Sequence, residues 1–170
     1  MGLRETFNIL TKMRNRYAEE ALLAALDRDP IIQLFAVRAI LERGQVSLLR
    51  RLVERYHLLK PAAKREAAEK LLLHSSLLRE IASSSDRQVR LNAYDIAAFQ
   101  PRGVLATLLA EGLSDDNPEI REISARALRD LARKLSAEMP PVTEQAEHPD
   151  VAAVLEALAT GLRIYEEFPN

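Results

Sequence analysis

The chain has 170 residues, a formal net charge of −1 and no cysteine. This length is enough for one domain with a sizeable core. The lack of cysteine excludes a disulfide framework and a thiol nucleophile, and the near-neutral charge gives no overall attraction to nucleic acid or an anionic membrane. No apolar run approaches the roughly 20 residues that span a bilayer, and the first residues lack a signal-peptide core. We therefore expect a soluble, cytoplasmic protein with no membrane partner.

The sequence predicts helices throughout. Hydrophobic residues make up 48% of the chain but aromatic residues only 5%, so the apolar content is mainly Leu and Ala, which favour helices. Apolar residues recur at three- and four-residue spacing, and no period-two alternation predicts a strand. Pro30, Pro61 and Pro118 each stand where a helix would begin, a position that tolerates the missing N–H group. Three polar residues are expected to cap helix N-termini: Asp29, Asp86 and Asn117.

The predicted helices group into hairpins. The breaks between helical segments predict hairpins at about 16–43, 46–73, 75–98 and 102–136. A leading helical segment from Leu3 is expected to continue to Leu26, because no Gly or Pro intervenes. A loop is predicted over 137–149, and a C-terminal helix, about 150–168, is expected to cap the stack. The whole chain, 1–170, is predicted to be a single domain.

One sequence pattern repeats along the chain. Its clearest copy runs from Leu113 to Leu128: a turn with Asp and Asn-Pro, then an aliphatic-Arg pair, then small residues. Looser copies precede it, and the aliphatic or Ala anchors of the four copies recur at similar intervals: Ile32, Ala63, Val89 and Ile120. Small residues within the copies would let neighbouring helices approach closely: Ala36, Ala67, Ala93, Ser124, Ala125 and Ala127.

The segment from Leu113 to Leu128 resembles the second half of a HEAT repeat, and the periodicity extends the resemblance over about residues 16–136. The resemblance implies an all-α fold: a right-handed α-solenoid of about four HEAT-like helical hairpins plus terminal capping helices. Hairpins of this kind stack because none of them can bury its apolar stripe alone.

The resemblance also implies a structural ladder. In HEAT proteins, an Asp in the turn and an Arg near the start of the second helix form a ladder between neighbouring repeats. Asp115 and Arg121 match these two positions, and Arg90 matches the Arg of the preceding copy. The ladder is incomplete, because Gln33 replaces the Arg of the first copy and Ser84 replaces the Asp of the third.

No sequence pattern predicts chemistry. His57, His74 and His148 lack the i, i+4 spacing of a metal-binding helix, and neither a Gly-rich phosphate loop nor a GxSxG run occurs. Helical-repeat DNA-base glycosylases are one enzyme alternative, but the lack of Trp argues against base stacking. Other HEAT-like proteins resemble bilin lyases, and no bilin site is recognisable. We expect no catalytic, metal-binding or cofactor-binding residues and no cofactor.

The first candidate partner surface is an apolar stripe. In HEAT stacks the second helices of the hairpins line the concave face, and the outward positions of the last copy are charged: Glu119, Glu122, Arg126, Arg129 and Arg133. The equivalent positions of the other copies are apolar and would form an exposed patch of the kind that binds partners: Leu34, Leu41, Leu91 and Phe99. The alternative is that the helix phase is off by one residue, or that the stack curls and buries them.

The second candidate is a basic patch. Between Arg38 and Arg65 there are eight basic residues against two acids, and from Glu138 onward seven acids against one base. Solvated helix faces would account for this imbalance. The alternatives are a patch for an acidic partner and charge pairing between copies. The patch residues would be Arg50, Arg51, Arg55 and Lys64.

These observations favour a non-catalytic protein–protein interaction or scaffold module, which binds another protein through its helical-repeat surface. The alternative is a nucleic-acid-binding helical-repeat protein that uses the basic region 38–65. The sequence names neither the partner nor the oligomeric state.

Overall fold

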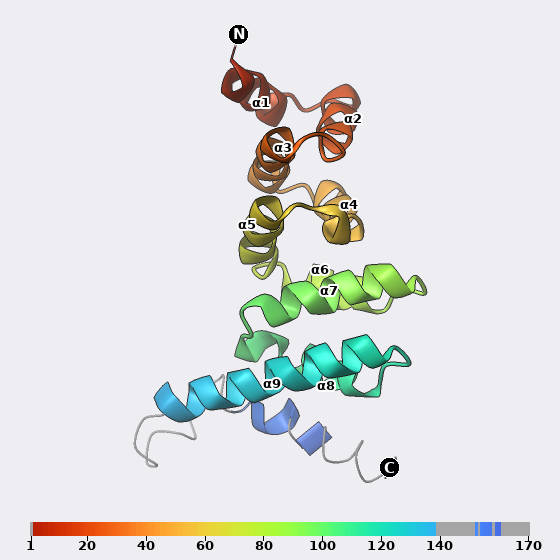
Figure 1. The fold of residues 1–170 in the computed structure, drawn as a ribbon, viewed down its shortest axis with the longest axis vertical. Helices are drawn as coiled ribbons and strands as arrows, with labels where there is room; N and C mark the ends of the chain where they lie inside the picture. The colour runs from red at the N-terminus through yellow and green to blue at the C-terminus, as the bar shows by residue number, and fades with distance from the viewer. Residues whose placement is uncertain (1, 139–151, 153, 158, 161–170) are drawn as a thin grey trace. The chain divides into compact units, whose positions relative to one another are not determined.

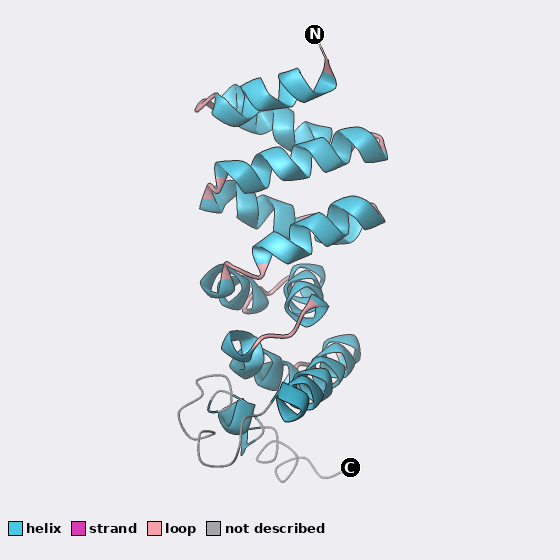
Figure 2. Ribbon diagram, turned by 90° about the vertical axis from the view of Figure 1, so that its left-hand side faces the viewer, coloured by secondary structure: helices cyan, strands magenta, loops and turns pink. Residues whose placement is uncertain are grey.

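The computed structural model describes residues 2–138, 152, 154–157, 159 and 160. Within these residues every regular element is a helix and none is a strand (Figure 2). The predicted all-α helical-repeat fold is therefore confirmed. The chain divides into two compact units, Met1–Asn92 and Ala93–Asn170. The single-domain organisation expected from the sequence stays a prediction.

The first unit consists of helices in two layers. Helices α1, α3 and α5 pack one on the next, and α2, α4 and α6 form the second layer (Figure 1). The pairs α2/α3 and α4/α5 are the first two predicted hairpins, and α6 with α7 forms the third. The helices are α1 (Leu3–Lys12), α2 (Arg16–Ala25), α3 (Pro30–Arg43), α4 (Val46–Glu54), the short 3-10 helix η1 (Tyr56–Leu58), α5 (Pro61–Leu71), α6 (Ser75–Ala82) and α7 (Arg87–Phe99), whose later part belongs to the second unit.

Neighbouring helices of the layer formed by α1, α3 and α5 are joined by apolar side chains. Helix α5 buries Ala63, Ala67 and Ala68, whose small side chains allow the close approach of α3. The rings of Phe7 and Phe35 stack with their centroids 5.7 Å apart, joining α1 to α3. The core therefore continues from one hairpin to the next, as expected when no hairpin can bury its own apolar face.

The helix starts lie where the sequence predicts them. Pro30, Pro61 and Pro118 are the first residues of α3, α5 and α9. The Oδ1 atom of Asp29 accepts hydrogen bonds from the amides of Ile31 and Ile32, at 3.0 and 3.1 Å. The side chains of the other two predicted caps likewise accept from first-turn amides: Asp86 and Asn117.

The predicted continuity from Leu3 to Leu26 is wrong. Helix α1 ends at Lys12, the backbone at Met13 is extended, and α2 begins at Arg16. The side chain of Asn15 caps α2 by accepting a hydrogen bond from the amide of Ala18 at 2.8 Å. An Asn cap can start a new helix without the Gly or Pro on which the prediction relied.

The second unit contains the rest of α7 and two further helices. They are α8 (Ala106–Glu111) and α9 (Pro118–Glu138), with 3-10 turns at Gly103–Leu105 (η2) and Gly112–Ser114 (η3). Helix α9 packs against α8 and η3. It buries one stripe of side chains and exposes the five charged positions predicted to face outward: Glu119, Glu122, Arg126, Arg129 and Arg133.

The predicted C-terminal elements are largely outside the described residues. Helix α9 extends to Glu138, so the first residues of the loop predicted over 137–149 are helical. The rest of that loop is outside the described residues. Of the helix predicted over 150–168, the described residues 152, 154–157, 159 and 160 are helical, and the remainder also lies outside.

A glycine allows the turn before α9 to lie against the helix. A Cβ atom at Gly112 would overlap the Oγ atom of Ser124 and lie 2.5 Å from the Cε1 atom of Tyr94. Any side chain at this position would push η3 away from α9.

Candidate interaction surface

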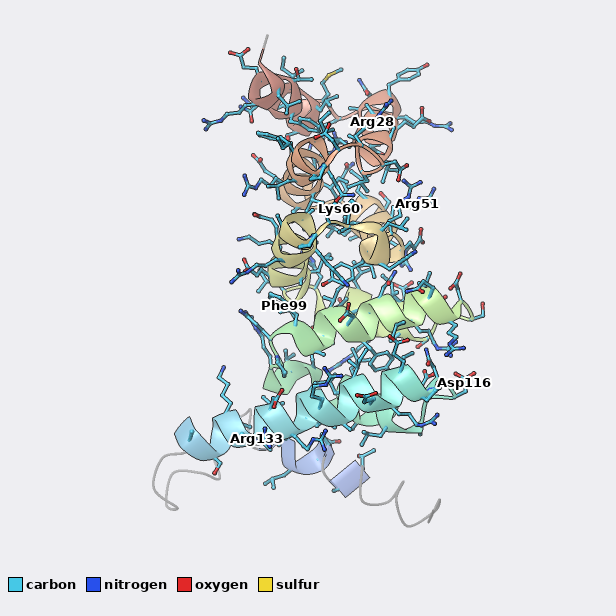
Figure 3. All side chains as sticks on the ribbon, in the orientation of Figure 1. Arg28, Arg51, Lys60, Phe99, Asp116 and Arg133 are labelled. Carbon is cyan, nitrogen blue, oxygen red and sulfur yellow. The ribbon has the colours of Figure 1, made fainter. Side chains whose placement is uncertain are left out.

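The predicted apolar stripe is only partly exposed. Leu34 and Leu41 on α3, and Leu91 on α7, are half-buried. Phe99, at the end of α7 in the second unit, is exposed (Figure 3). The role of these residues in binding stays a prediction.

The half-burial on α3 follows from the phase of the helix. The exposed line of α3 runs through Ile31, Arg38 and Glu42. Phe35 lies to one side of this line and stacks on Phe7 of α1. The opposite side, which carries the two leucines of the stripe, therefore faces α5. An apolar residue on the exposed line, Ile31, was missed, although its i, i+3 spacing from Leu34 would have indicated it.

The arginines of the predicted basic patch are paired with carboxylates. Arg50 forms an ion pair with Glu80 of α6 at 2.7 Å. Arg55 pairs with Asp27, in the turn that follows α2, at 2.9 Å. The third arginine, Arg51, lies on the outer side of α4 (Figure 3) and pairs with Glu54 of the same helix at 3.3 Å.

The fourth residue of the patch, Lys64, lies over an aromatic ring. Its Nζ atom is 4.8 Å from the centroid of the Tyr56 ring, a cation–π geometry that holds the ammonium group close to the protein. The four residues therefore present much less free positive charge than their number implies, because each arginine has a carboxylate partner and Lys64 lies over the Tyr56 ring.

The predicted ladder residues contact their own turns. Arg121 Nη1 donates to the carbonyl oxygens of Asp115 and Asp116, at 2.9 and 3.1 Å. Arg90 Nη1 donates in the same way to the carbonyl of Ser84 at 3.2 Å. Each Arg thus stabilises the turn that precedes its own helix. Contact of these residues with a neighbouring repeat stays a prediction.

Two buried amides join successive hairpins. Gln33 Nε2 donates to the carbonyl of Leu26 at 2.7 Å, and Gln33 Oε1 accepts from the amide of Lys60 at 2.7 Å. Asn92 Nδ2 donates to the carbonyl of Val53, at the end of α4, at 2.8 Å. These amides therefore hold the turn of one hairpin against the next, a role that the sequence pattern did not assign to them.

A buried arginine makes a third link. The side chain of Arg43 is fully buried at the end of α3. It donates to the backbone carbonyls of Leu10 and Met13 and to Gln45 Oε1, and it pairs with Glu19 of α2 at 3.3 Å. One side chain thus joins α1, α2, α3 and the start of α4.

Neither metal ligands nor membrane spans are found in the part of the chain that the structure describes. No group of three or more His, Asp or Glu side chains there could hold a metal ion. No helix in that part is long and apolar enough to cross a membrane.

Comparison with known families agrees with the helical arrangement. Residues 105–135 match the family model of the HEAT repeat, and this range includes the segment from Leu113 to Leu128 that carried the resemblance in the sequence. A search of curated proteins finds no match to this chain. The predicted resemblance to the HEAT repeat is thus confirmed over residues 105–135.

Proposed function

We propose that this chain is a non-catalytic protein-binding module. HEAT repeats generally serve as protein-interaction scaffolds. The observation that carries the proposal is the set of large apolar side chains exposed on the first unit, whose hairpins are held together by buried polar contacts. Such side chains stabilise a complex when a partner covers them. The three that carry the proposal lie near the connections between hairpins: Tyr17, Val46 and Leu73.

The apolar stripe offers one test of this proposal. A tagged full-length chain is used to capture proteins from a lysate of the source organism, in parallel with a Leu34→Glu, Leu91→Glu double variant. We expect the variant to lose a captured protein, because both side chains are partly exposed and a charge there would oppose their burial by a partner. Far-UV circular dichroism must show unchanged helicity, since both positions are half-buried.

A matched control separates a specific effect from added charge. Ala62→Glu places the same carboxylate on the exposed side of α5 and should leave capture intact. Equal capture by the chain and the stripe variant would exclude this stripe as the binding site. If no protein is captured from the lysate at all, the proposed function fails.

The alternative function, nucleic-acid binding through the region 38–65, receives less support. Phosphate contacts need cations that are free to replace counterions, and Arg50, Arg51 and Arg55 each have a carboxylate partner. A salt titration with random-sequence duplex distinguishes the two functions. Steep loss of binding with added salt would favour this alternative.

A further inference from the structure

The connections between successive helix pairs in the first unit share one edge. Residues 13–15 join α1 to α2, residues 44–45 join α3 to α4, and residues 72–74 join α5 to α6. Because α1, α3 and α5 pack side by side in the same direction, all three end at this edge, on the left in Figure 2.

Two of these connections are fixed to each other. Arg43 donates to the carbonyl of Met13 and, through Nε, to Gln45 Oε1 at 2.8 Å. Gln45 Nε2 in turn donates to Glu19 Oε1, in the first turn of α2, at 3.1 Å. These two connections are therefore held in place before a partner arrives, which lowers the entropy lost on binding.

Large apolar side chains are exposed at every connection of this edge. Val46 and Leu73 are 59% and 64% exposed, Met13 is 41% exposed, and Tyr17 at the start of α2 is 81% exposed. Tyrosine is among the residues that contribute most to protein interfaces, because its ring buries a large area at low entropic cost.

Unpaired cations flank these apolar side chains. Lys12, Arg14 and Lys70 are exposed and have no carboxylate partner among the described residues. One exposed and equally unpaired carboxylate, Glu42, lies in the last turn of α3. This edge therefore carries free positive charge. The basic patch predicted from the sequence differs from it, because the arginines of that patch are paired with carboxylates.

We propose that this edge, defined by Met13, Tyr17, Val46 and Leu73 with Lys12, Arg14 and Lys70, binds an acidic polypeptide segment that carries large apolar side chains. The inference rests on the proposed protein-binding function and specifies its surface and its partner's chemistry. Carboxylates of the segment pair with the free cations, and its apolar side chains cover the exposed ones.

The edge suits a polypeptide better than a lipid surface. Electrostatic membrane binding typically uses a cluster of about four to eight basic residues or a continuous amphipathic helix. Here three cations are divided between two connections, and the apolar side chains stand on separate turns. Spaced anchors of this kind match alternate or helically spaced side chains of a peptide.

The test is a selection from a random dodecapeptide library displayed on phage, with the full chain as the target. Enriched peptides are made with a fluorescein label and their affinity is measured by fluorescence anisotropy. We expect acidic peptides with aliphatic or aromatic residues. Their affinity should fall at least about tenfold for a Val46→Asp, Leu73→Asp variant, and should also fall for Lys12→Glu, Arg14→Glu.

The control variant changes the opposite edge of the same unit. Ile31→Asp with Leu58→Asp replaces two exposed apolar residues near turns within hairpins, and peptide affinity should stay within about twofold of that of the unchanged chain. Both Val46 and Ile31 lie in first helical turns, where a carboxylate is favourable. The charge-reversal variant leaves the apolar residues intact and so tests the edge even if an Asp variant unfolds.

Several outcomes would overturn the inference. These are enrichment of basic or uncharged peptides, no enrichment, or equal peptide affinity for the edge variants. Sedimentation of the chain with phosphatidylserine–phosphatidylcholine vesicles, abolished by Lys12→Glu, Arg14→Glu, would indicate a membrane instead. A rise in molecular mass with concentration, abolished by the same variant, would indicate a second copy.

Failure of this inference is distinguishable from failure of the proposed function. If the selected peptides lose affinity for the Leu34→Glu, Leu91→Glu variant but not for the edge variants, the chain still binds protein through a different surface. If the selection enriches no peptide and the lysate capture experiment also yields no protein, the function itself is wrong.

Discussion

Arg43 shows how one charged residue can be stable in an apolar interior. Its guanidinium group donates to two backbone carbonyls at the end of α1, to Gln45 and to Glu19. A buried charge is tolerated only when its hydrogen-bonding groups are satisfied in this way. The helix that carries Arg43 is followed by Gly44, whose φ of +63° ends α3 and turns the chain toward α4.

Replacing this arginine should destabilise the first unit. Arg43→Met removes the donors of the carbonyls of Leu10 and Met13 and leaves Glu19 without its ion pair. We expect a loss of about 2–3 kcal/mol in the free energy of unfolding, measured by urea titration with far-UV circular dichroism. The control is Arg38→Met, whose exposed pair with Glu66 should contribute less than about 1 kcal/mol. Equal losses for the two variants would contradict the role of Arg43 as a link.

A second residue-scale prediction concerns the close approach at Gly112. Gly112→Ala would place a methyl group against Ser124 and Tyr94. Neither neighbour is a flexible side-chain end at the surface, since both are buried. We expect the free energy of unfolding, measured by thermal or urea denaturation, to fall by about 1–3 kcal/mol, because overpacking forces the backbone to shift. Gly2→Ala, which meets nothing within 4 Å, is the control, and an unchanged unfolding midpoint for Gly112→Ala would be inconsistent with the packing of η3 on α9.

At the scale of the helices, side chains of one hairpin form hydrogen bonds with the helix ends of another. Gln33, near the start of α3, bridges the end of α2 and the residue that precedes α5. Asn92 on α7 reaches the end of α4 in a similar way. Helix ends carry backbone groups with no partner inside the helix, and here some of these groups are satisfied by side chains of the neighbouring hairpin.

The hydrogen bond that Gln33 accepts can be tested by measuring hydrogen exchange at a single backbone amide, that of Lys60. In Gln33→Leu the amide of Lys60 and the carbonyl of Leu26 lose their partner, which should cost about 1–3 kcal/mol. We expect faster hydrogen exchange at the Lys60 amide, measured by NMR. The amide of Lys64, which donates to the carbonyl of Lys60 inside α5 at 2.8 Å, serves as the internal control. Unchanged exchange at Lys60 would show that the side chain does not hold this turn.

The sequence predicts most helices well because their starts depend on local signals. Pro30 and Asp29 fix the beginning of α3 within a few residues, independent of the rest of the fold. The break between α1 and α2 was missed because its signal, a single Asn15, is also common inside loops and helices. The bridges of Gln33 and Asn92 could not be predicted, because their partners lie in other hairpins.

At the scale of the whole molecule, charge counted along the sequence differs from charge in space. The region 38–65 is strongly basic by sequence, yet its arginines meet Asp27, Glu66 and Glu80 from outside the region. The apolar stripe was placed by projecting one repeat onto the others. That projection located the charged face of α9, but on α3 it selected residues on the side that faces α5. Surface predictions depend on helix phase and on neighbours in space, which periodicity alone does not give.

Protein binding by this chain can be tested by placing a photo-crosslinking amino acid at Leu34, Val46 or Arg51, one at a time, in the full chain expressed in the source cells. We expect discrete adducts from Leu34 or Val46 that protease removes and nuclease does not, and none from Arg51. Nuclease-sensitive adducts from Arg51 would instead indicate nucleic-acid binding, and no adduct at any of the three positions would show that the chain does not bind protein through these surfaces.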